Sequence, residues 1–188
     1  MHRLRPTLRL LPLALTAACT GFQYVSPDVF RSPQPGEDQL ARRILAHDIR
    51  TVVCLRGHGD ETAASRRATA AAGAEFVNVP MSARRLPPPA TLLELWHIAD
   101  SAERPLLLHC RAGVDRTGLA AAIVVLHDTG DLGRARAQLA LVPYGHVGAM
   151  GTEAMGEVLD RYERHAARLS FPDWIRDVYA AEYESLAR

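Results

Sequence analysis

The chain has 188 residues, of which 48% are hydrophobic and 23% charged, and its net charge is +1. This length and apolar content predict one globular domain with a buried core. The near-zero net charge gives no electrostatic basis for nucleic-acid binding, and three cysteines do not make a disulfide framework. Because no metal-binding or nucleotide-binding signature appears, the sequence implies no metal and no cofactor.

The beginning of the chain has the pattern of an export signal. Three arginines precede an apolar stretch over residues 10–18 that is too short to span a bilayer. Ala17-Ala18-Cys19 resembles a bacterial lipoprotein processing site, in which Cys19 becomes the acylated first residue. We therefore expect a signal peptide over residues 1–18 and one domain over residues 20–188, exported to the periplasm or anchored to the membrane through Cys19. A cytoplasmic protein with an N-terminal extension is the alternative.

The hydrophobic pattern predicts strands that alternate with helices. Strands are predicted over residues 22–25, 29–31, 51–55, 75–79 and 106–109. Helices are predicted over residues 36–47, 61–72, 89–99, 117–128, 132–142 and 152–169, with a last one from Pro172. This alternation is typical of an α/β fold with a mostly parallel central sheet and helices on both faces. Ligands of such sheets bind beyond the carboxyl ends of the strands, where Cys110 lies.

The most informative segment joins the last predicted strand to a helix and reads His109-Cys110-Arg111-Ala112-Gly113-Val114-Asp115-Arg116-Thr117-Gly118. A tight loop before a helix N-terminus directs backbone N–H groups at an anion, and the helix dipole adds positive potential. That potential favours the nucleophilic thiolate form of Cys110. Arg116 offers a planar fork to two phosphate oxygens, and Thr117 is placed to hydrogen-bond the sulfur. Ala112 and Gly113 are small enough for the backbone to turn its amides inward.

The order His-Cys-x5-Arg-Thr-Gly resembles the signature loop of the protein tyrosine phosphatase superfamily, in its compact dual-specificity-like branch with atypical bacterial members. Two flanking stretches, 29–35 and 49–57, resemble the opening of bacterial dual-specificity-like phosphatases. The resemblance covers residues 22–127 and implies the cysteine-phosphatase fold for the single domain. It also implies hydrolysis of phosphate monoesters through a cysteinyl-phosphate intermediate, with Cys110 as the nucleophile and Arg116 as the clamp for the anion.

The other positions of the loop complete the candidate site. We expect Arg111, Ala112, Gly113, Val114 and Thr117 to contribute to phosphate binding. His109 either supports the loop from beneath by hydrogen bonds or packs as an ordinary core histidine. Arg111, together with Arg84 and Arg85, is a candidate for a basic rim around the mouth of the site, and a solvated surface is the alternative for Arg84 and Arg85.

The proton donor departs from the family pattern. The family usually supplies an aspartate from a loop upstream of the cysteine, yet residues 80–89 contain no carboxylate. Asp115 is the preferred substitute, since its Asp-Arg pair resembles myotubularin-type and some bacterial lipid and tyrosine phosphatases, where that aspartate is assigned the acid role. The alternative is that Asp115 only orients Arg116 or caps the helix. Asp60 or Glu61 is the reserve candidate for the acid.

Phosphotyrosine-like aryl esters are the first substrate class to expect, because an aryl oxide leaves with less help from an acid, and dual specificity is compatible with the loop. A phosphoinositide or inositol phosphate phosphatase is the alternative. Such enzymes often carry two lysines in the loop, where this chain has Arg111 and Val114. A phosphate-binding protein without turnover is a second alternative, and a rhodanese-like sulfurtransferase is disfavoured by the Arg-Thr-Gly ending. The expected partner is a phosphorylated protein or a small phosphoester, not a nucleic acid.

Two residues outside the loop also carry chemistry. Cys54 ends a strand that we expect beside the strand of Cys110. It either forms a reversible disulfide with Cys110 that protects the nucleophile, or it is a small buried hydrophobic residue. Gly145 and His146 follow the main helices, and a turn is the simpler interpretation of this pair than a contribution to the site.

Overall fold

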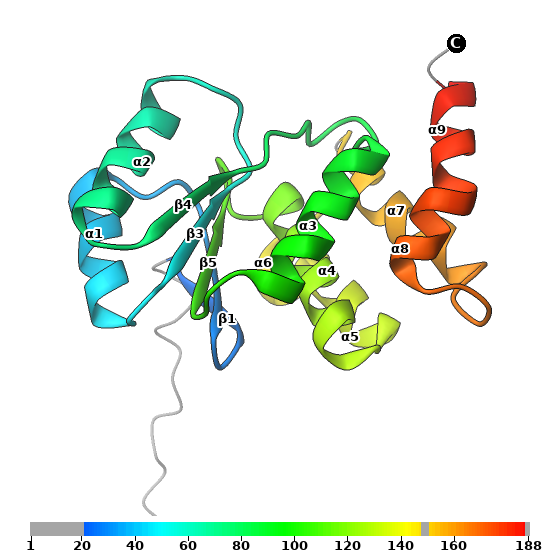
Figure 1. The fold of residues 1–188 in the computed structure, drawn as a ribbon, viewed down its shortest axis with the longest axis horizontal. Helices are drawn as coiled ribbons and strands as arrows, with labels where there is room; N and C mark the ends of the chain where they lie inside the picture. The colour runs from blue at the N-terminus through cyan, green and yellow to red at the C-terminus, as the bar shows by residue number, and fades with distance from the viewer. Residues whose placement is uncertain (1–20, 148–150, 187–188) are drawn as a thin grey trace, which may run out of the picture.

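The computed structural model describes residues 21–147 and 151–186, and within them a five-stranded sheet forms the centre of the molecule (Figure 1). The strands are β1 (Gln23–Ser26), β2 (Val29–Ser32), β3 (Thr51–Cys54), β4 (Glu75–Asn78) and β5 (Leu106–His109). Their order is β1-β2-β5-β3-β4, and all neighbouring pairs are parallel except β1 with β2. The predicted mostly parallel sheet is confirmed, and its strands match the predicted ranges to within a residue or two.

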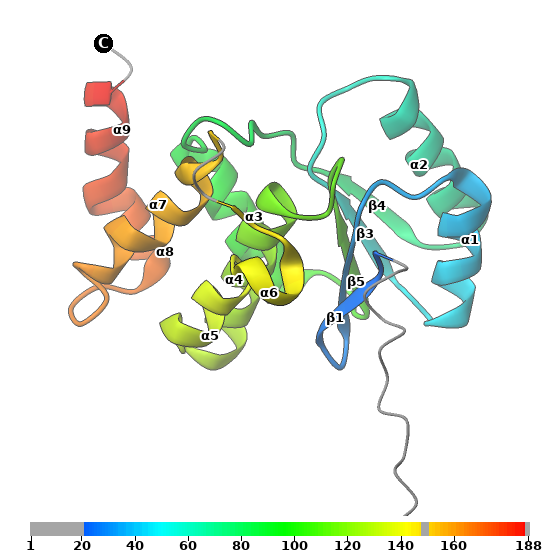
Figure 2. The ribbon, with the colours of Figure 1, turned by 180° about the vertical axis from the view of Figure 1, so that it is seen from behind.

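Helices cover both faces of the sheet, as the alternating pattern predicts (Figures 1 and 2). One face carries α1 (Glu37–Ala46) and α2 (Asp60–Ala71), and the other carries α3 (Pro89–Ser101) and α4 (Asp115–Thr129). Further from the sheet lie α5 (Leu132–Ala137), α6 (Leu141–Tyr144), α7 (Glu153–Glu163), α8 (Phe171–Trp174) and α9 (Ala180–Leu186). A π-helical stretch over Ile175–Tyr179 joins the last two of these helices.

Two hydrophobic cores separate the layers, because successive side chains of a strand point to opposite faces. Leu106 and Leu108 of β5 enter the core beneath α3 and α4, whereas Leu107 enters the core beneath α1 and α2. The helix α4 lies deepest, since every residue over 119–126 is buried. It begins directly after the Cys110 loop, so the most buried helix fixes the loop in place.

Two of the predicted helices are shorter than expected. The segment predicted as one helix over 132–142 is divided into α5 and α6, and Val142 is extended with φ −115° and ψ 127°. Pro143 accounts for the extended Val142, since a proline disfavours the helical conformation at the residue before it. The helix predicted to reach Leu169 ends at Glu163, and the chain turns back so that the Tyr162 hydroxyl donates to the Leu169 carbonyl at 3.2 Å.

The leader expected over residues 1–18, and Cys19, lie outside the described residues, so the export signal stays a prediction. Within residues 21–147 and 151–186, no helix has both the length and the apolar character needed to cross a membrane.

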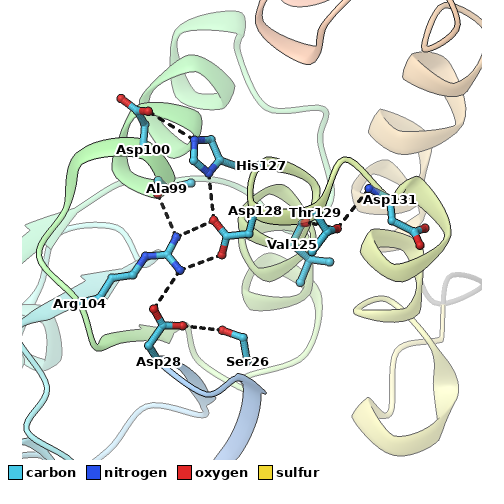
Figure 3. Close-up of polar contacts among 10 residues, drawn as sticks. All are labelled: Ser26, Asp28, Ala99, Asp100, Arg104, Val125, His127, Asp128, Thr129 and Asp131. Carbon is cyan, nitrogen blue, oxygen red and sulfur yellow. Dashed lines mark hydrogen bonds and ion pairs between the residues drawn. The ribbon is translucent and has the colours of Figure 1, made fainter.

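A polar cluster joins three elements at the edge of the sheet where the parallel strands begin (Figure 3). Arg104 donates two hydrogen bonds to the Asp128 carboxylate at the end of α4, at 2.7 and 2.8 Å. The same guanidinium reaches Asp28, between β1 and β2, at 3.3 Å, and the Ala99 carbonyl of α3 at 3.0 Å. His127 contacts the Asp128 carboxylate at 3.0 Å. The cluster lies at the end of the strands opposite to the Cys110 loop.

Candidate active site

The candidate site lies where the parallel strands end. Ser32, Cys54, Asn78 and His109 align across the sheet, each the last residue of its strand. The loop after His109 therefore emerges at the edge at which α/β sheets bind their ligands.

The loop closes around the sulfur of Cys110. The Gly113 N–H donates to Cys110 Sγ at 3.3 Å, and the cysteine is only 2% exposed. Helix α4 begins at Asp115, so its N-terminus points its free N–H groups toward the same space. Thr117 is buried in the first turn of α4, and its Oγ1 atom has no hydrogen-bond partner among the described residues. Backbone N–H groups arranged in this way are typical of anion-binding loops.

Gly113 is required by the way in which the loop packs. Its φ is +73°, and a Cβ atom would lie 2.4 Å from the Pro33 nitrogen and 2.5 Å from the Ser32 carbonyl carbon. The loop therefore rests directly on the backbone that follows β2. A second link is a hydrogen bond from the Gln34 N–H to the Arg111 carbonyl at 3.2 Å.

Arg31 holds the loop from beneath. It is 1% exposed, and its Nη2 atom donates to the carbonyls of Gly113 and Val114, both at 3.0 Å. Its Nη1 atom donates to the Gln138 carbonyl at 2.9 Å, and the Tyr144 ring lies 3.9 Å from the guanidinium carbon. Burial lowers the pKa of Arg31 to about 10, so it remains a cation at neutral pH. Sequence analysis missed this residue, although an arginine within an apolar strand was the available signal.

Arg116 extends from the start of α4 toward the ends of two neighbouring segments. Its Nη1 atom donates to the Leu55 carbonyl after β3 at 3.2 Å, and it lies 3.5 Å from the Met81 carbonyl. Both contacts use the same nitrogen of the guanidinium, Nη1.

His109 is fully buried at the end of β5. Neither ring nitrogen has a hydrogen-bond partner among the described residues. Burial lowers the pKa of the imidazole to about 4, which outweighs a smaller opposing effect of the Cys110 backbone. The imidazole is therefore neutral at physiological pH. Any positive potential at the sulfur comes from the loop amides, the helix and the arginines rather than from His109.

Asp115 contacts His146, for which the sequence favours a turn over a contribution to the site. Its Oδ1 atom lies 2.8 Å from Nδ1 of His146, whose side chain is 7% exposed. The two residues are 31 positions apart, so no local pattern connects them. Beside them is a cavity of about 210 Å³, whose lining is mostly apolar and consists of Ala112, Val114, Asp115, Gly145, Val147 and Thr152.

The remaining carboxylate candidates lie on exposed positions of α2. Asp60 is exposed at the start of the helix, and Glu61 forms an ion pair with Arg56. The loop between β4 and α3 is fixed by the Tyr179 hydroxyl, which donates to the Pro87 carbonyl at 2.7 Å. In the same loop, Arg84 and Arg85 are exposed.

The two thiols of the described residues, Cys54 and Cys110, lie on different sides of the sheet. Cys54 is buried toward α2, with its Sγ atom 3.9 Å from Thr62 Oγ1, whereas Cys110 belongs to the core beneath α4. Burial raises the pKa of the Cys54 thiol. This placement favours Cys54 as a small buried hydrophobic residue.

No group of three or more His, Cys, Asp or Glu side chains within residues 21–147 and 151–186 is arranged to hold a metal ion.

The sequence matches the family described as "DSP-PTPase phosphatase fused to NAD+ Kinase" over residues 25–133, more than half of the chain. The chain belongs to the DSP-PTPase family of cysteine-based phosphatases. A search of curated proteins gave no match by sequence.

Solved structures share the fold of this phosphatase. Tk-PTP in its active form is 22% identical with a TM-score of 0.61, over 79% of this chain and 98% of that chain. TpbA from P. aeruginosa is 24% identical with a TM-score of 0.59, over 79% of this chain and 92% of that chain. PTPMT1 is 16% identical with a TM-score of 0.59, over 79% of this chain and 99% of that chain.

Proposed function

We propose that the protein hydrolyses phosphate monoesters of the phosphotyrosine type through a cysteinyl-phosphate intermediate. The observation that carries this proposal is the hydrogen bond from the Gly113 N–H to Cys110 Sγ, because it turns the loop amides toward the nucleophile. In the first step the Cys110 thiolate attacks phosphorus, the S–P bond forms and the ester P–O bond breaks. Arg116 and the loop amides, with Arg111, Ala112 and Val114 among them, stabilise the phosphoryl oxygens.

Asp115 is the proposed proton donor. It gives its proton to the leaving oxygen as the ester bond breaks, and the apolar cavity beside it suits an aryl group. In the second step Asp115 accepts a proton from water as the water oxygen attacks phosphorus. The S–P bond then breaks, inorganic phosphate is released, and the free Thr117 hydroxyl donates to the departing thiolate.

The choice of phosphotyrosine as first substrate is supported by a relative. A structure of P. aeruginosa TpbA, 21% identical to this chain, was solved in complex with pTyr. Phosphoinositides and inositol phosphates are the second candidate, because PTPMT1 was solved in complex with PI(5)P and SIW14 from S. cerevisiae is described as a PP-IP phosphatase. Arg111 is exposed at the mouth, where it is available to a second phosphate group.

The test compares turnover of phenyl phosphate, a phosphotyrosine peptide and a phosphatidylinositol phosphate by four proteins. Wild type is expected to hydrolyse the aryl esters fastest, and Cys110→Ser to lose turnover while still binding inorganic phosphate. Asp115→Asn should lose about 10²-fold in kcat on phenyl phosphate, the usual contribution of a general acid. Asp38→Asn, an exposed carboxamide substitution on α1, is the matched control and should behave as wild type.

Absence of turnover by wild type on all three substrates would overturn the enzymatic proposal. Faster turnover of the lipid than of the peptide would replace the substrate class, and full activity of Asp115→Asn on phenyl phosphate would remove Asp115 from its role.

A further inference from the structure

The side chain of His146 contacts Asp115, the first residue of α4. It follows α6 and is placed by a tight turn, in which the Gly145 N–H donates to the Leu141 carbonyl at 2.6 Å and Gly145 has a φ of +74°. The His146 N–H then donates to the Ala140 carbonyl at 3.3 Å. A glycine is the residue that adopts this left-handed conformation without strain. The turn delivers a nearly fully buried imidazole to the Asp115 carboxylate.

Segment 141–146 is attached to the Cys110 loop at two points. Tyr144 packs against the guanidinium of Arg31, which in turn donates to the Val114 carbonyl at 3.0 Å. His146 makes the second attachment through its 2.8 Å contact with Asp115. The two attachments therefore reach adjacent residues of the loop, Val114 and Asp115, and the second of them contacts the carboxyl group directly.

The Asp115 carboxylate needs such a constraint. Asp115 is the first residue of α4, and a carboxylate at a helix N-terminus tends to bond the free backbone N–H groups of the first turn. In the structure its hydrogen bond is with His146 instead, and the N-terminus of α4 has no side-chain cap. Only its Oδ1 atom takes part in that contact, and Asp115 lines the same cavity as Ala112 and Val114.

We propose that His146 is a positioning residue, which holds the Asp115 carboxyl group at the leaving oxygen through an Nδ1–H hydrogen bond to Oδ1. This inference rests on the proposed function, in which Asp115 is the proton donor. When Asp115 has given its proton to the leaving oxygen, the Nδ1–H bond holds the resulting carboxylate in place. The other carboxylate oxygen, Oδ2, which gave up that proton, then accepts the proton of the attacking water, so one orientation serves both steps.

The experiment separates hydrogen bonding from packing. His146→Asn places an N–H donor near the position of Nδ1, whereas His146→Phe fills the space without a donor. Each variant is assayed on p-nitrophenyl phosphate, whose leaving group needs little protonation, and on phenyl phosphate, whose leaving group needs much. His97→Ala, an exposed histidine on α3, is the control. Thermal unfolding and inorganic phosphate affinity are measured for every variant to establish that the loop is intact.

On phenyl phosphate, His146→Phe is expected to lose about 10-fold to 10²-fold in kcat, most of the contribution of a general acid, and His146→Asn to recover most of that loss. On p-nitrophenyl phosphate both variants should remain close to wild type. An equal loss on the two esters, or no loss on either, would overturn the positioning role.

The behaviour of Asp115→Asn keeps the two proposals distinct. If Asp115→Asn shows the dependence on the leaving group and His146→Phe does not, the role of His146 fails and that of Asp115 stands. If Asp115→Asn is fully active on phenyl phosphate, the acid assignment itself fails.

Discussion

His109 lies directly before the nucleophile, and its burial separates it from the usual behaviour of a histidine. With a pKa of about 4 against an ordinary value of 6.5, the imidazole is neutral in the folded protein over the range in which an unfolded chain would be charged. The residue therefore contributes shape rather than charge to the site. Because burial disfavours the charged imidazole, protonation of His109 lowers the free energy of unfolding.

The pH dependence of stability follows from this difference. Because the unfolded chain binds the proton more tightly, the stability due to neutral His109 is present above pH 6.5 and is lost as the pH falls toward 4. The loss amounts to roughly 3 kcal/mol when the shift acts in full. Urea unfolding of wild type and His109→Asn between pH 4 and 7.5 measures it. Wild type should show the steeper decline, and parallel curves would contradict the prediction.

The residues of the site differ in how far the sequence reveals them. Cys110, Arg116 and Gly113 belong to one short segment, and their spacing indicates an anion-binding loop because an apolar strand precedes it and a helix follows it. Arg31 and His146 reach that loop from elsewhere in the chain, and their partners are set by tertiary packing. The sequence indicates the chemistry that is local, and it misses the side chains that support the loop from a distance.

At the scale of elements, the strands of this fold are more predictable than its later helices. The three central strands, β2, β3 and β5, are buried along their whole length, and the largely apolar runs of β3 and β5 are a strong signal. In the region after α4 the apolar pattern continues through Val142, but Pro143 interrupts the helix there. The position of this region against the rest of the molecule depends on long-range contacts such as that of Tyr144 with Arg31. A hydrophobic pattern within one segment cannot predict such a contact.

The positions of Cys54, at the end of β3, and Cys110, directly after β5, predict how the protein responds to oxidation. Because Cys54 faces α2 and Cys110 lies in the opposite core, we expect mild peroxide to oxidise Cys110 to its sulfenic acid and then its sulfinic acid without a disulfide to Cys54. Peptide mass mapping of wild type and Cys54→Ser after peroxide treatment measures this. Both should yield the same Cys110 oxyacids, and a peptide containing linked Cys54 and Cys110 would disprove the expectation.

At the scale of the whole molecule, polar contacts join the elements at both ends of the sheet. One end carries the candidate active site, and the contacts at the other end stabilise the fold. The Cys110 loop occupies one end, whereas the Arg104 cluster joins β1–β2, α3 and α4 at the other (Figure 3). Burial acts to raise the pKa of Asp128, but hydrogen bonds from Arg104 and His127 outweigh it and lower the pKa below its ordinary value. The cluster thus favours an ionised Asp128 in the folded state.

Removing this cluster should affect stability and not catalysis. Arg104→Ala is expected to lower the free energy of unfolding by about 1–3 kcal/mol, because a bidentate and partly buried pair is broken. Arg176→Ala is the matched control, since its ion pair with Asp173 is more than half exposed and should contribute less than about 0.5 kcal/mol. Urea unfolding and kcat on p-nitrophenyl phosphate are measured for both variants. A fall in kcat for Arg104→Ala, or equal losses of unfolding free energy in the two variants, would contradict the prediction that the Arg104 cluster acts on stability alone.

The burial of Arg31 beneath the loop links anion binding to the stability of the protein. Its hydrogen-bond partners in the described part of the chain are carbonyl and amide oxygens, none of them a carboxylate. Cys110 and Asp115 supply negative charge near its guanidinium, and an anion bound at the loop adds to it. Any ligand that binds the native state alone adds its binding free energy to folding. Phosphate, the product of the proposed reaction, should therefore raise the free energy of unfolding, and the increase should grow with the phosphate concentration.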